Sequence, residues 1–476
     1  METARPNGTS GPTETAAPGT DANGGGDRID VPAAVLELLE TLWAAGHAGW
    51  VVGGSLRDAF VGRPALDWDL ATDALPDRLL AIFPGAVYEN QFGTVAVRHG
   101  GTLYEITTFR TDHDYADFRR PHHVEFGTSL EEDLRRRDFT VNAMAWGAAA
   151  PTGGDHPTAA LVDPFDGRGD VARRMLRAVG DPAVRFEEDA LRMIRAVRLA
   201  ATLGFDIEPA TLAAISARSE LVAHLSGERI GAELGKLLAA PRPSIGLRLM
   251  ADTGILDRVS PELAAQRGIA QNKLAGEDLW DHTVRAVDAA PVDRPIVRLA
   301  ALVHDIGKPA TAADGHFYGH DRVGADLARD VLERLRYPRA VIDRVVALVR
   351  LHMFDYQASW SDPAVRRFIG KVGRGSLDEL FALRTADNVG SGVEPDGAGL
   401  AELRRRVDEQ IAADAAVDRS DLAVDGDDLI RELGLKGGPG IGRILAQLLD
   451  RVVADPALND RPTLLLLART LVEDEP

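Results

Sequence analysis

The chain has 476 residues, of which 45% are hydrophobic, and it carries a net charge of −19 and no cysteine. This length exceeds one ordinary domain core and predicts about two to four domains. The lack of cysteine excludes disulfides and thiolate metal ligands and fits a reducing cytoplasm. The sequence has no run of about 18 apolar residues, which argues against a membrane span and against a membrane partner.

Residues 1–28 are rich in glycine, threonine, proline and alanine. They lack the apolar segment of a secretory signal, and this composition cannot bury a core. We therefore expect a disordered tail over residues 1–28 and a cytoplasmic protein.

Residues 29–150 combine helical and strand patterns. Apolar residues at helical spacing predict helices in VPAAVLELLETLWAAGH, in SLRDAFVG, with Ser55 near its start, and in PDRLLAIF. Short apolar or alternating runs predict strands in GWVVGG and LDWDLAT. The run TVAVRHGGTLYEITTFR predicts a β-hairpin that turns at His99-Gly100-Gly101. This part of the chain therefore predicts a small mixed sheet with helices.

Two aspartates, Asp67 and Asp69, lie one residue apart in the strand-like run LDWDLAT. On a strand, residues two apart face the same side, so both carboxylates project together and Trp68 points away from them. A divalent cation removes their mutual repulsion, and Mg²⁺ held by carboxylates and substrate phosphates is the usual arrangement in phosphoryl and nucleotidyl transfer. A pair of surface aspartates in a turn is the alternative.

A glycine turn, Gly53-Gly54, stands where the strand GWVVGG gives way to a helix. Backbone N–H groups at such a turn can bind an anion, and glycine lets a phosphate approach closely. Arg57, in the first helical turn, can reach the same anion. Glu105 becomes a third carboxylate of the site if its strand neighbours the strand of Asp67. An ordinary tight turn and a solvent-facing glutamate are the alternatives.

The segment DHDYADFRRPHHVEF, residues 112–126, is strongly polar and shows no clear periodicity. It predicts a mobile loop beside the carboxylates. From residue 182 onward the pattern is helical almost throughout.

A basic stretch lies between residues 168 and 198 of this acidic chain. Its arginines are Arg168, Arg173, Arg174, Arg177, Arg185, Arg192, Arg195 and Arg198. The net charge alone argues against a nucleic-acid partner, but a local basic stripe supplies the phosphate contacts that such a partner needs. A solvated arginine-rich helix face is the alternative.

Histidines and aspartates in a later helical block are candidate metal ligands. An adjacent pair, His304-Asp305 in LVHDIGK, and the distant His282 and Asp387 can make a four-ligand site for a divalent metal. The string LVHDIGK is similar to the HD signature of metal-dependent phosphohydrolases. His320 and His352 match the extra histidines that accompany a second metal in such sites.

The ordered series of motifs resembles the class II tRNA nucleotidyltransferases, which comprise CCA-adding enzymes and bacterial poly(A) polymerases. The resemblance begins with GGSLRDAFVG, DWDLAT, EITTFR and EEDLRRRDFTVNAMAW. It continues in the family's order with LVDPFDGRGD, FEEDALRMIRAVRLAATLGF and GERIGAELGKLL, and it covers roughly residues 35–390. Each fragment alone is weak, but the series is specific.

The resemblance implies an α+β fold: a mixed-sheet nucleotidyltransferase head followed by all-α neck, body and HD-type domains. On this basis we assign residues 1–28 to the tail and residues 29–150 to the head. Residues 151–270 form a helical neck and RNA-binding region, residues 271–395 the HD domain, and residues 396–476 an acidic helical C-terminal region.

The family's functional residues carry over one by one. Gly53, Gly54 and Arg57 match contacts to the nucleotide triphosphate, and Arg137 matches a further nucleotide contact. Asp67 and Asp69 match the magnesium ligands, and Glu105 resembles the third head carboxylate. The residues that match nucleotide contacts of the neck are Asp189, Arg192, Arg195 and Arg198.

The implied reaction is template-independent addition or repair of the 3′-CCA end of tRNA from CTP and ATP. The 3′-hydroxyl of the RNA, made more acidic by one metal, attacks the α-phosphate, and a second metal stabilises the leaving pyrophosphate. A poly(A) polymerase of the same family is the alternative, which the acidic C-terminal tail disfavours. A further alternative is a phosphohydrolase whose head only binds RNA.

The implied cofactors are Mg²⁺ in the head and a divalent metal, Mn²⁺, Ni²⁺, Mg²⁺ or Fe²⁺, in the HD domain. The implied partners are the 3′ end of tRNA, CTP and ATP, and no obligate protein partner is evident. The HD site is expected either to hydrolyse phosphate ends or cyclic phosphates or to stabilise the domain only.

Asp189 and Arg192, three residues apart in one expected helix, can select the base. Cytosine and adenine both present an amino donor beside a ring-nitrogen acceptor, whereas uracil and guanine present a carbonyl beside a ring N–H. A carboxylate only accepts and a guanidinium only donates, so the pair matches C and A. An ion pair within the helix is the alternative.

Overall fold

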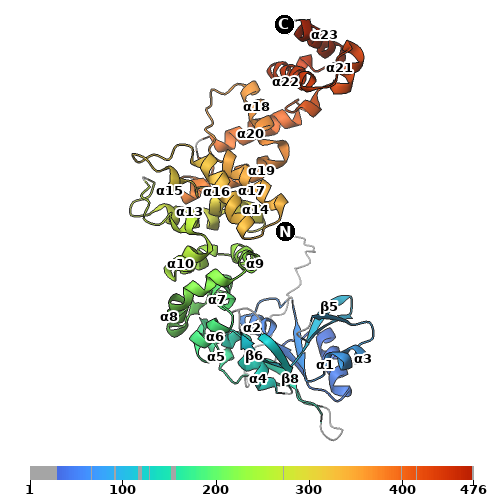
Figure 1. Cartoon of the computed structure of the whole chain (residues 1–476), viewed down its shortest axis with the longest axis vertical. Coiled ribbons are helices and arrows are strands. Elements are labelled where there is room, and N and C mark those ends of the chain that lie inside the picture. Colours follow the sequence, from blue (N-terminus) through green and yellow to red (C-terminus); the bar gives the residue numbers. More distant parts are fainter. Residues whose placement is uncertain are drawn as a thin grey trace, which may run out of the picture.

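The computed structural model describes residues 29–473 except 66, 91–92, 116–120, 128, 152–156, 272, 398 and 414. The expected disordered tail, residues 1–28, lies outside the described residues. The molecule is elongated, with a sheet-containing head at one end and the C-terminal helices at the other (Figure 1). Among the described helices, none has the length and apolar character that crossing a membrane requires.

The head is built on a seven-stranded mixed sheet, as far as its residues are described. In spatial order its strands are β3 (Val87–Asn90), β4 (Thr94–His99), β5 (Thr102–Thr108), β2 (Asp69–Thr72), β1 (Gly49–Val52), β8 (Ala145–Ala148) and β9 (Ala160–Val162). Its helices are α1 (Ala33–Ala44), α2 (Gly54–Val61), α3 (Pro76–Ile82) and α4 (Leu130–Arg135). The α+β class is confirmed.

The hairpin of β4 and β5 confirms the predicted turn. Gly100 and Gly101 have φ of 56° and 84°, which glycine adopts without the steric cost of a side chain. β2 pairs with β5 in parallel, with Leu70 opposite Ile106. The two strands that carry Asp69 and Glu105 are therefore neighbours, as the third-carboxylate hypothesis requires.

Two expectations for the head were wrong. Residues 112–115 and 121–126 do not belong to an irregular loop, because β6 (Arg110–Tyr115) and β7 (Pro121–Phe126) pair antiparallel, and residues 116–120 lie outside the described residues. This two-stranded ribbon is separate from the main sheet, so its sequence lacks the apolar alternation that signals a half-buried strand. The sheet also extends past residue 150, because β9 pairs with β8.

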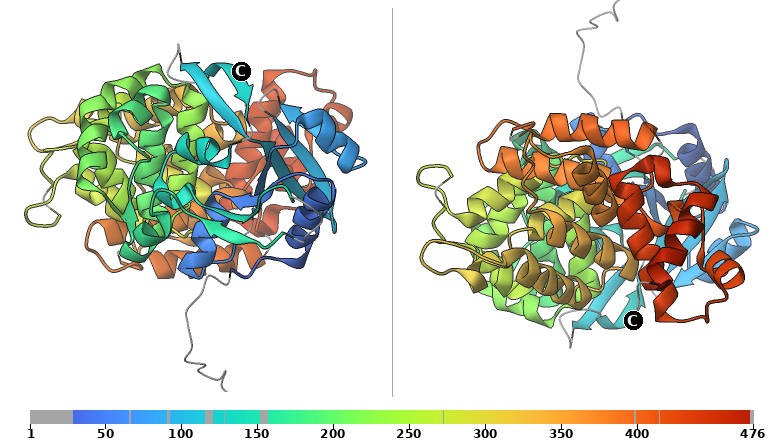
Figure 2. Two further views of the ribbon diagram at one scale, coloured as in Figure 1. Left: turned by 90° about the horizontal axis from the view of Figure 1, so that it is seen from below. Right: turned by 90° about the horizontal axis from the view of Figure 1, so that it is seen from above.

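The neck is helical and lies beside the head strands when the molecule is viewed along its long axis (Figure 2). Its helices are α5 (Gly167–Arg173), α6 (Pro182–Glu188), α7 (Leu191–Leu203), α8 (Pro209–Arg218), α9 (Gly227–Leu238), α10 (Pro243–Asp252), α11 (Ile255–Val259) and α12 (Pro261–Ala264). A small parallel pair, β10 (Met175–Leu176) and β11 (Asp206–Ile207), lies within it, on either side of α6 and α7 in the chain.

The HD region follows as a helical bundle. Its helices are α13 (Leu279–Ala289), α14 (Pro295–Val303), α15 (Lys308–Thr311), α16 (His320–Arg334), α17 (Arg339–Leu351), α18 (Asp362–Val372) and α19 (Leu377–Gly390). Arg298 ties this bundle to the neck. Its side chain is 3% exposed and donates to the carbonyl oxygens of Leu238, at 2.5 Å, and Ala240, at 2.6 Å.

The C-terminal helices are α20 (Leu400–Ala412), α21 (Gly426–Leu433), α22 (Pro439–Ala454) and α23 (Arg461–Glu473). Short 3₁₀ turns lie at Thr140–Asn142, Ser219–His224, Arg374–Ser376, Arg419–Asp421 and Pro456–Leu458. One apolar core runs from the head through the neck and the HD region. The last three helices pack around a separate core that includes Leu429, Leu448 and Leu464.

Candidate active site and metal centre

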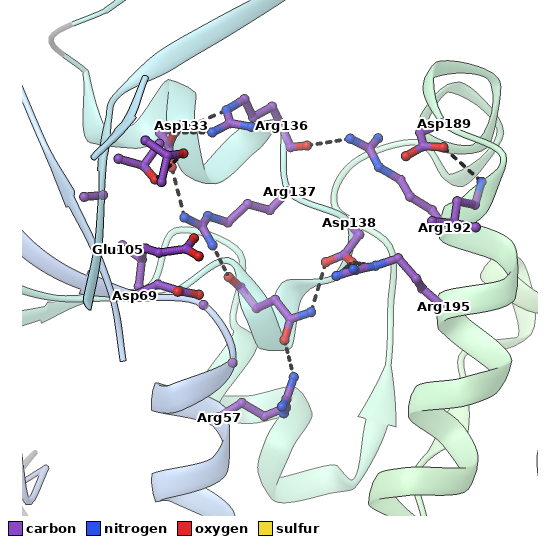
Figure 3. A pocket seen from close by; sticks show the side chains of 18 of the residues that line it. Arg57, Asp69, Glu105, Asp133, Arg136, Arg137, Asp138, Asp189, Arg192 and Arg195 are labelled. Atoms are coloured by element: carbon purple, nitrogen blue, oxygen red, sulfur yellow. Dashed lines mark hydrogen bonds and ion pairs between the residues drawn. The ribbon is translucent and has the colours of Figure 1, made fainter. Parts of the chain in front are cut away.

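A cavity of about 540 Å³ opens between the head and the neck. Its walls come from the head strands, from α2 and α4, and from the neck helices α7 and α9 (Figure 3). It brings together most of the predicted head and neck residues. Those that line it are Gly53, Gly54, Arg57, Asp69, Glu105, Arg137, Asp189, Arg192, Arg195 and Arg198.

The head carboxylates lie at one side of this cavity. Figure 3 shows Asp69 and Glu105 directed toward the same space from the adjacent strands β2 and β5. β2 begins at Asp69, so Asp69 lies in the strand and Asp67 lies two residues before it. The expectation that both aspartates lie within the strand was therefore wrong for Asp67. The alternation holds nevertheless, because Asp67 and Asp69 are exposed and Trp68 between them is 9% exposed.

These carboxylates fit a magnesium ion. The pKa of Asp69 is raised, because the surrounding cavity wall removes water from the carboxylate although part of the residue stays exposed. The guanidinium of Arg137 acts against this rise, and the negative charge of Asp67 adds to it. A divalent cation would remove this conflict between like charges, and carboxylate oxygens are the ligands that Mg²⁺ prefers. Asp67 and Asp69 would hold the ion, with Glu105 beside them.

The glycine turn is shaped by its neighbours. Gly53 has φ of 83° and caps α2, which begins at Gly54 rather than at Ser55. A β-carbon at Gly53 would lie 3.1 Å from Nη1 of Arg137 and 3.7 Å from Oδ2 of Asp69. The backbone conformation therefore favours glycine, and a β-carbon there would also press on the end of the Arg137 side chain. The N–H groups at the start of α2 are donors of the kind that bind an anion.

A chain of hydrogen bonds connects the head to the neck. Arg57 donates to the side-chain oxygen of Asn142 at 2.6 Å, and the Asn142 amide donates to Asp138 at 3.0 Å. Asp138 also pairs with Arg195 of α7 at 2.7 Å. Burial alone would raise the pKa of Asp138, but Arg195 and Asn142 hold it well below its ordinary value. This chain fixes the neck arginine relative to the head helix α2.

A second ion-pair group positions Arg137. Asp133, which is 1% exposed, pairs with Arg136 at 2.7 Å and with Arg137 at 3.2 Å. Burial opposes ionisation of Asp133, yet the two guanidinium groups keep its pKa below the ordinary value. Arg137 is thereby directed toward Gly53 and Asp69, where the nucleotide phosphates are expected.

The proposed base-selecting pair does not sit on one helix. α6 ends at Glu188, Asp189 has extended backbone angles of φ −147° and ψ 103°, and α7 begins at Leu191. The Asp189 carboxylate accepts the Leu191 N–H at 3.0 Å, which favours a helix start over a continuous helix. The expected unbroken helix was therefore wrong at this residue.

Asp189 and Arg192 each have a different charged partner. Asp189 pairs with Arg229 of α9 at 2.8 Å, and Arg192 pairs with Glu188 at 2.5 Å. Arg192 also donates to the main-chain oxygens of Arg185 and Arg136, at 3.0 Å and 2.9 Å. Asp189 and Arg192 therefore do not form the ion pair with each other that was the alternative. Their actual partners hold both side chains at the cavity wall.

Arg198 occupies the far end of the same helix face as Arg195. It pairs with Glu233 of α9 at 2.7 Å, and Glu233 is 3% exposed. Burial lowers the pKa of Arg198, with Glu233 acting in the opposite direction. The arginines of the neck that line the cavity are therefore held in place by ion pairs with buried or half-buried carboxylates.

The predicted HD ligands meet in the bundle of α13 to α19. They form two groups, His282, His304 and Asp387 in one, and Asp305, His320 and His352 in the other. Within each group the ligand atoms lie within 4.8 Å of one another. One oxygen of Asp305 lies 3.1 Å from Nε2 of His304 and the other lies 3.4 Å from Nε2 of His320. Asp305 thus bridges the two groups.

The donor chemistry of this cluster fits divalent metal ions. Its four imidazoles and two carboxylates would hold such ions, since imidazole and carboxylate are both common ligands of divalent metals. Nδ1 of His304, His320 and His352 faces a main-chain oxygen at 2.8, 2.7 and 2.6 Å, which orients Nε2 toward the cluster.

Several residues of both sites were not predicted from the sequence. In the cavity these are Asp133, Arg136, Asn142 and Arg229, and at the HD cluster they are Lys273, Lys308 and Arg384. Glu188, the ion-pair partner of Arg192, was also missed. Asp133 and Asn142 lie within quoted motifs, but their roles depend on long-range contacts. Arg229 and Glu233, four residues apart in α9, lie on one face of that helix, but the sequence does not indicate that this face meets Asp189 and Arg198.

Three family patterns match the chain. The Poly A polymerase head domain matches residues 49–177, and the probable RNA and SrmB- binding site of polymerase A matches residues 204–267. The HD domain pattern matches residues 272–391.

Similar proteins cover nearly the whole chain. The CCA-adding enzyme of Geobacillus stearothermophilus is 35% identical over 428 residues, which are 90% of this chain and 94% of that protein. The CCA-adding enzyme of Geobacillus thermodenitrificans is 37% identical over 429 residues, with the same coverage. A crystal structure of the Bacillus stearothermophilus CCA-adding enzyme in complex with CTP shares 31% identity and a TM-score of 0.69 over 93% of this chain and 98% of that one. At 20% identity, a Thermotoga maritima CCA-adding enzyme complexed with tRNA shares the fold, with a TM-score of 0.57 over 93% of this chain and 96% of that one.

Proposed function

The chain belongs to the family of CCA-adding enzymes, the nucleotidyltransferases that add CCA to the 3′ end of tRNA, and from this premise we propose how its residues divide the work. The head binds the triphosphate and carries the metal ligands. The neck selects the base. The HD cluster is a second, separate active site. The observation that carries the first two assignments is the shared cavity in which head carboxylates face neck arginines.

The head binds the triphosphate of CTP or ATP. The N–H groups after Gly53 and the guanidinium groups of Arg57 and Arg137 supply donors on one side of the cavity. Asp67 and Asp69 would hold Mg²⁺, which neutralises phosphate charge and makes the 3′-hydroxyl of the tRNA more acidic when it is bound. No side chain needs to form a covalent intermediate, because the 3′-hydroxyl of the RNA attacks the α-phosphate directly.

The neck selects C and A through Asp189 and Arg192. A carboxylate offers about four lone pairs. Asp189 can therefore keep its ion pair with Arg229 and still accept a hydrogen bond from the amino group of the base. The hydrogen bonds of Arg192 to Arg185, Glu188 and Arg136 engage three of the five N–H groups that a guanidinium has. The partners therefore hold the two side chains in place without using up their capacity to bind a base.

The HD cluster hydrolyses a phosphate ester. The observation that favours this second function is the convergence of six ligands from five segments of the bundle, with Asp305 shared between two groups. The metals would supply an activated water and charge neutralisation when bound. Lys308, with Nζ 2.6 Å from Asp305, places an additional cation where a substrate phosphate would lie.

The direct test incubates purified protein with tRNA that lacks CCA and with each labelled nucleotide separately, followed by sizing of the products. We expect incorporation of C and A and a product that stops at the completed CCA end. A product that grows into a long run of A would identify a poly(A) polymerase instead and would overturn the assignment of CTP as a substrate.

A further inference from the structure

Helix α9 of the neck lies between the neck helix α7 and the HD bundle (Figure 1). On the side of α7, Arg229 donates to both carboxylate oxygens of Asp189, at 2.8 Å and 3.0 Å. One turn further along α9, Glu233 pairs with Arg198 at 2.7 Å. Asp189 and Arg198 both line the nucleotide cavity. The positions of these two side chains in the cavity therefore depend on where α9 lies.

The opposite side of α9 rests on the backbone of the HD bundle. Residues two apart on an α-helix point about 200° away from each other, so Gly231 faces away from both Arg229 and Glu233. A β-carbon at Gly231 would collide with the main-chain oxygen of Leu335, the residue that follows α16. The missing side chain therefore lets the backbone of α9 touch the backbone of the HD bundle, and this contact leaves no space for displacement toward the bundle.

Hydrogen bonds from the HD bundle hold α9 at two further points. The hydroxyl of Tyr337, between α16 and α17, donates to the main-chain oxygen of Gly231 at 3.1 Å. Burial raises the pKa of Tyr337 to about 12, so this hydroxyl stays protonated at neutral pH and remains a donor. Arg298 of α14 donates to the main-chain oxygens of Leu238 and Ala240 at the end of α9. The HD bundle thus fixes both the middle and the end of α9.

The metal cluster is not part of this contact. The ligand His320 is the first residue of α16, whereas Leu335 and Tyr337 follow the last residue of that helix. A helix of this length separates its two ends by about 20 Å. The contact with α9 can therefore persist when the metal ligands are changed.

We propose that the HD bundle sets the position of the base-selecting residues of the neck, with Gly231 and Tyr337 as positioning residues for the choice of nucleotide. Neither is among the residues that line the nucleotide cavity. Both act through α9, on which Arg229 holds Asp189. The inference rests on the proposed selection of C and A by Asp189 and Arg192, and it gives the HD bundle a part in that selection that does not depend on bound metal.

The test measures kcat/KM for each nucleotide in the full-length protein. CTP and UTP are compared on tRNA that lacks CCA, and ATP and GTP on tRNA that ends in CC. The variants are Gly231→Ala and Tyr337→Phe, with Asp189→Ala as the reference for lost selection. Gly235→Ala is the matched control, because a β-carbon there would lie 3.9 Å from the hydroxyl of Tyr337, an ordinary contact. Alanine is the better helix former at both glycine positions, so the two alanine variants differ in their contact with the HD bundle.

We expect Gly231→Ala to lower the preference for CTP over UTP and for ATP over GTP about tenfold, because a misplacement of about 1 Å caused far from the reacting atoms can cost up to about 10²-fold. Tyr337→Phe should act in the same direction by about twofold to threefold, since it removes one hydrogen bond. Gly235→Ala should keep the wild-type preference. A smaller folded fraction lowers the rates with all four nucleotides equally, so the ratio of two kcat/KM values separates positioning from a general loss of stability.

An unchanged preference in Gly231→Ala, beside a lost preference in Asp189→Ala, would overturn this inference and leave base selection by the neck standing. An unchanged preference in both variants would overturn the proposed selection as well. If Gly231→Ala does not fold, Tyr337→Phe decides, and a wild-type preference in that variant would contradict the inference. An equal loss in Gly235→Ala would also contradict it, because the contact of Gly231 with Leu335 would then not be the cause.

Discussion

The two candidate sites of this chain hold their charged side chains in different ways. The HD ligands come from one helical bundle, and their exposures lie between 1% for His304 and 8% for Asp387. The nucleotide cavity lies between two units, and its head carboxylates Asp69 and Glu105 are exposed. The HD cluster is therefore assembled within one packed helical bundle, whereas the nucleotide site depends on how the neck is oriented against the head.

The largest expected effect separates the sites by removing a head carboxylate. Asp69→Ala should lower nucleotide incorporation by at least roughly 10²- to 10³-fold, because the charge-stabilising interactions at the reacting phosphate are lost. Binding of tRNA should survive, since it depends mainly on phosphate contacts from arginines elsewhere. Single-turnover incorporation and a filter-binding assay measure the two quantities.

Asp77→Ala, in the exposed first turn of α3, is the matched control for Asp69→Ala and should retain incorporation. Substantial transfer activity in Asp69→Ala would remove this residue from the site.

The second effect removes the bridge of the HD cluster. Asp305→Ala should abolish binding of both metals, because its two oxygens face the two ligand groups. Phosphohydrolase activity should fall by roughly 10²-fold or more, and metal content by elemental analysis should fall with it. CCA addition should remain within about twofold, since the cluster contributes no ligand to the head.

A collapse of CCA addition in a folded Asp305→Ala protein would show that the two sites are coupled. Circular dichroism establishes the folded state, and the buried joint at Arg298 would then be the first place to look for the coupling.

The sequence indicated the HD ligands more completely than the neck geometry. The string around His304 and Asp305 and the isolated His282, His320, His352 and Asp387 all meet, because helices of one bundle present residues at regular spacing. The break at Asp189 was missed, since apolar periodicity continues across it and the cue is a single capping bond to Leu191. The antiparallel pair of β6 and β7 was missed because its sequence is polar and it forms a sheet of its own, separate from the main sheet.

Partners across units were also beyond sequence reasoning. Arg229 lies 40 residues from Asp189, and Asn142 lies 85 residues from Arg57. Local patterns carry no information about which distant helix a cation will face. The Gly53 turn and the Gly100-Gly101 hairpin, in contrast, were identified because their backbone requirements are local.

The smallest effect tests the joint between the two units. Asp138→Asn should lower the free energy of unfolding by about 1–3 kcal/mol at neutral pH, because it removes the charged partner of Arg195. The pKa of Asp138 is held below its ordinary value of 3.8, so its contribution is present above that value and is lost as the pH falls toward the folded pKa.

The difference in urea midpoint between the two proteins should therefore shrink as the pH falls from about 7 to about 3. A difference that stays constant over this range would mean that ionised Asp138 does not supply the stability. Asn142, which donates to Asp138, should then be examined as the neutral contact that holds the joint.

The most direct test of the account is the choice of nucleotide by the neck. Steady-state incorporation of CTP, ATP, UTP and GTP is measured for the wild type, Asp189→Ala and Arg192→Ala. Each lost pair of base contacts should cost about 1–3 kcal/mol of discrimination, so the use of CTP and ATP falls while the exclusion of UTP and GTP relaxes. Arg229→Ala should act less strongly, through Asp189 alone. Variants of Asp189 and Arg192 that keep wild-type efficiency and selectivity would contradict the claim that the neck selects the base.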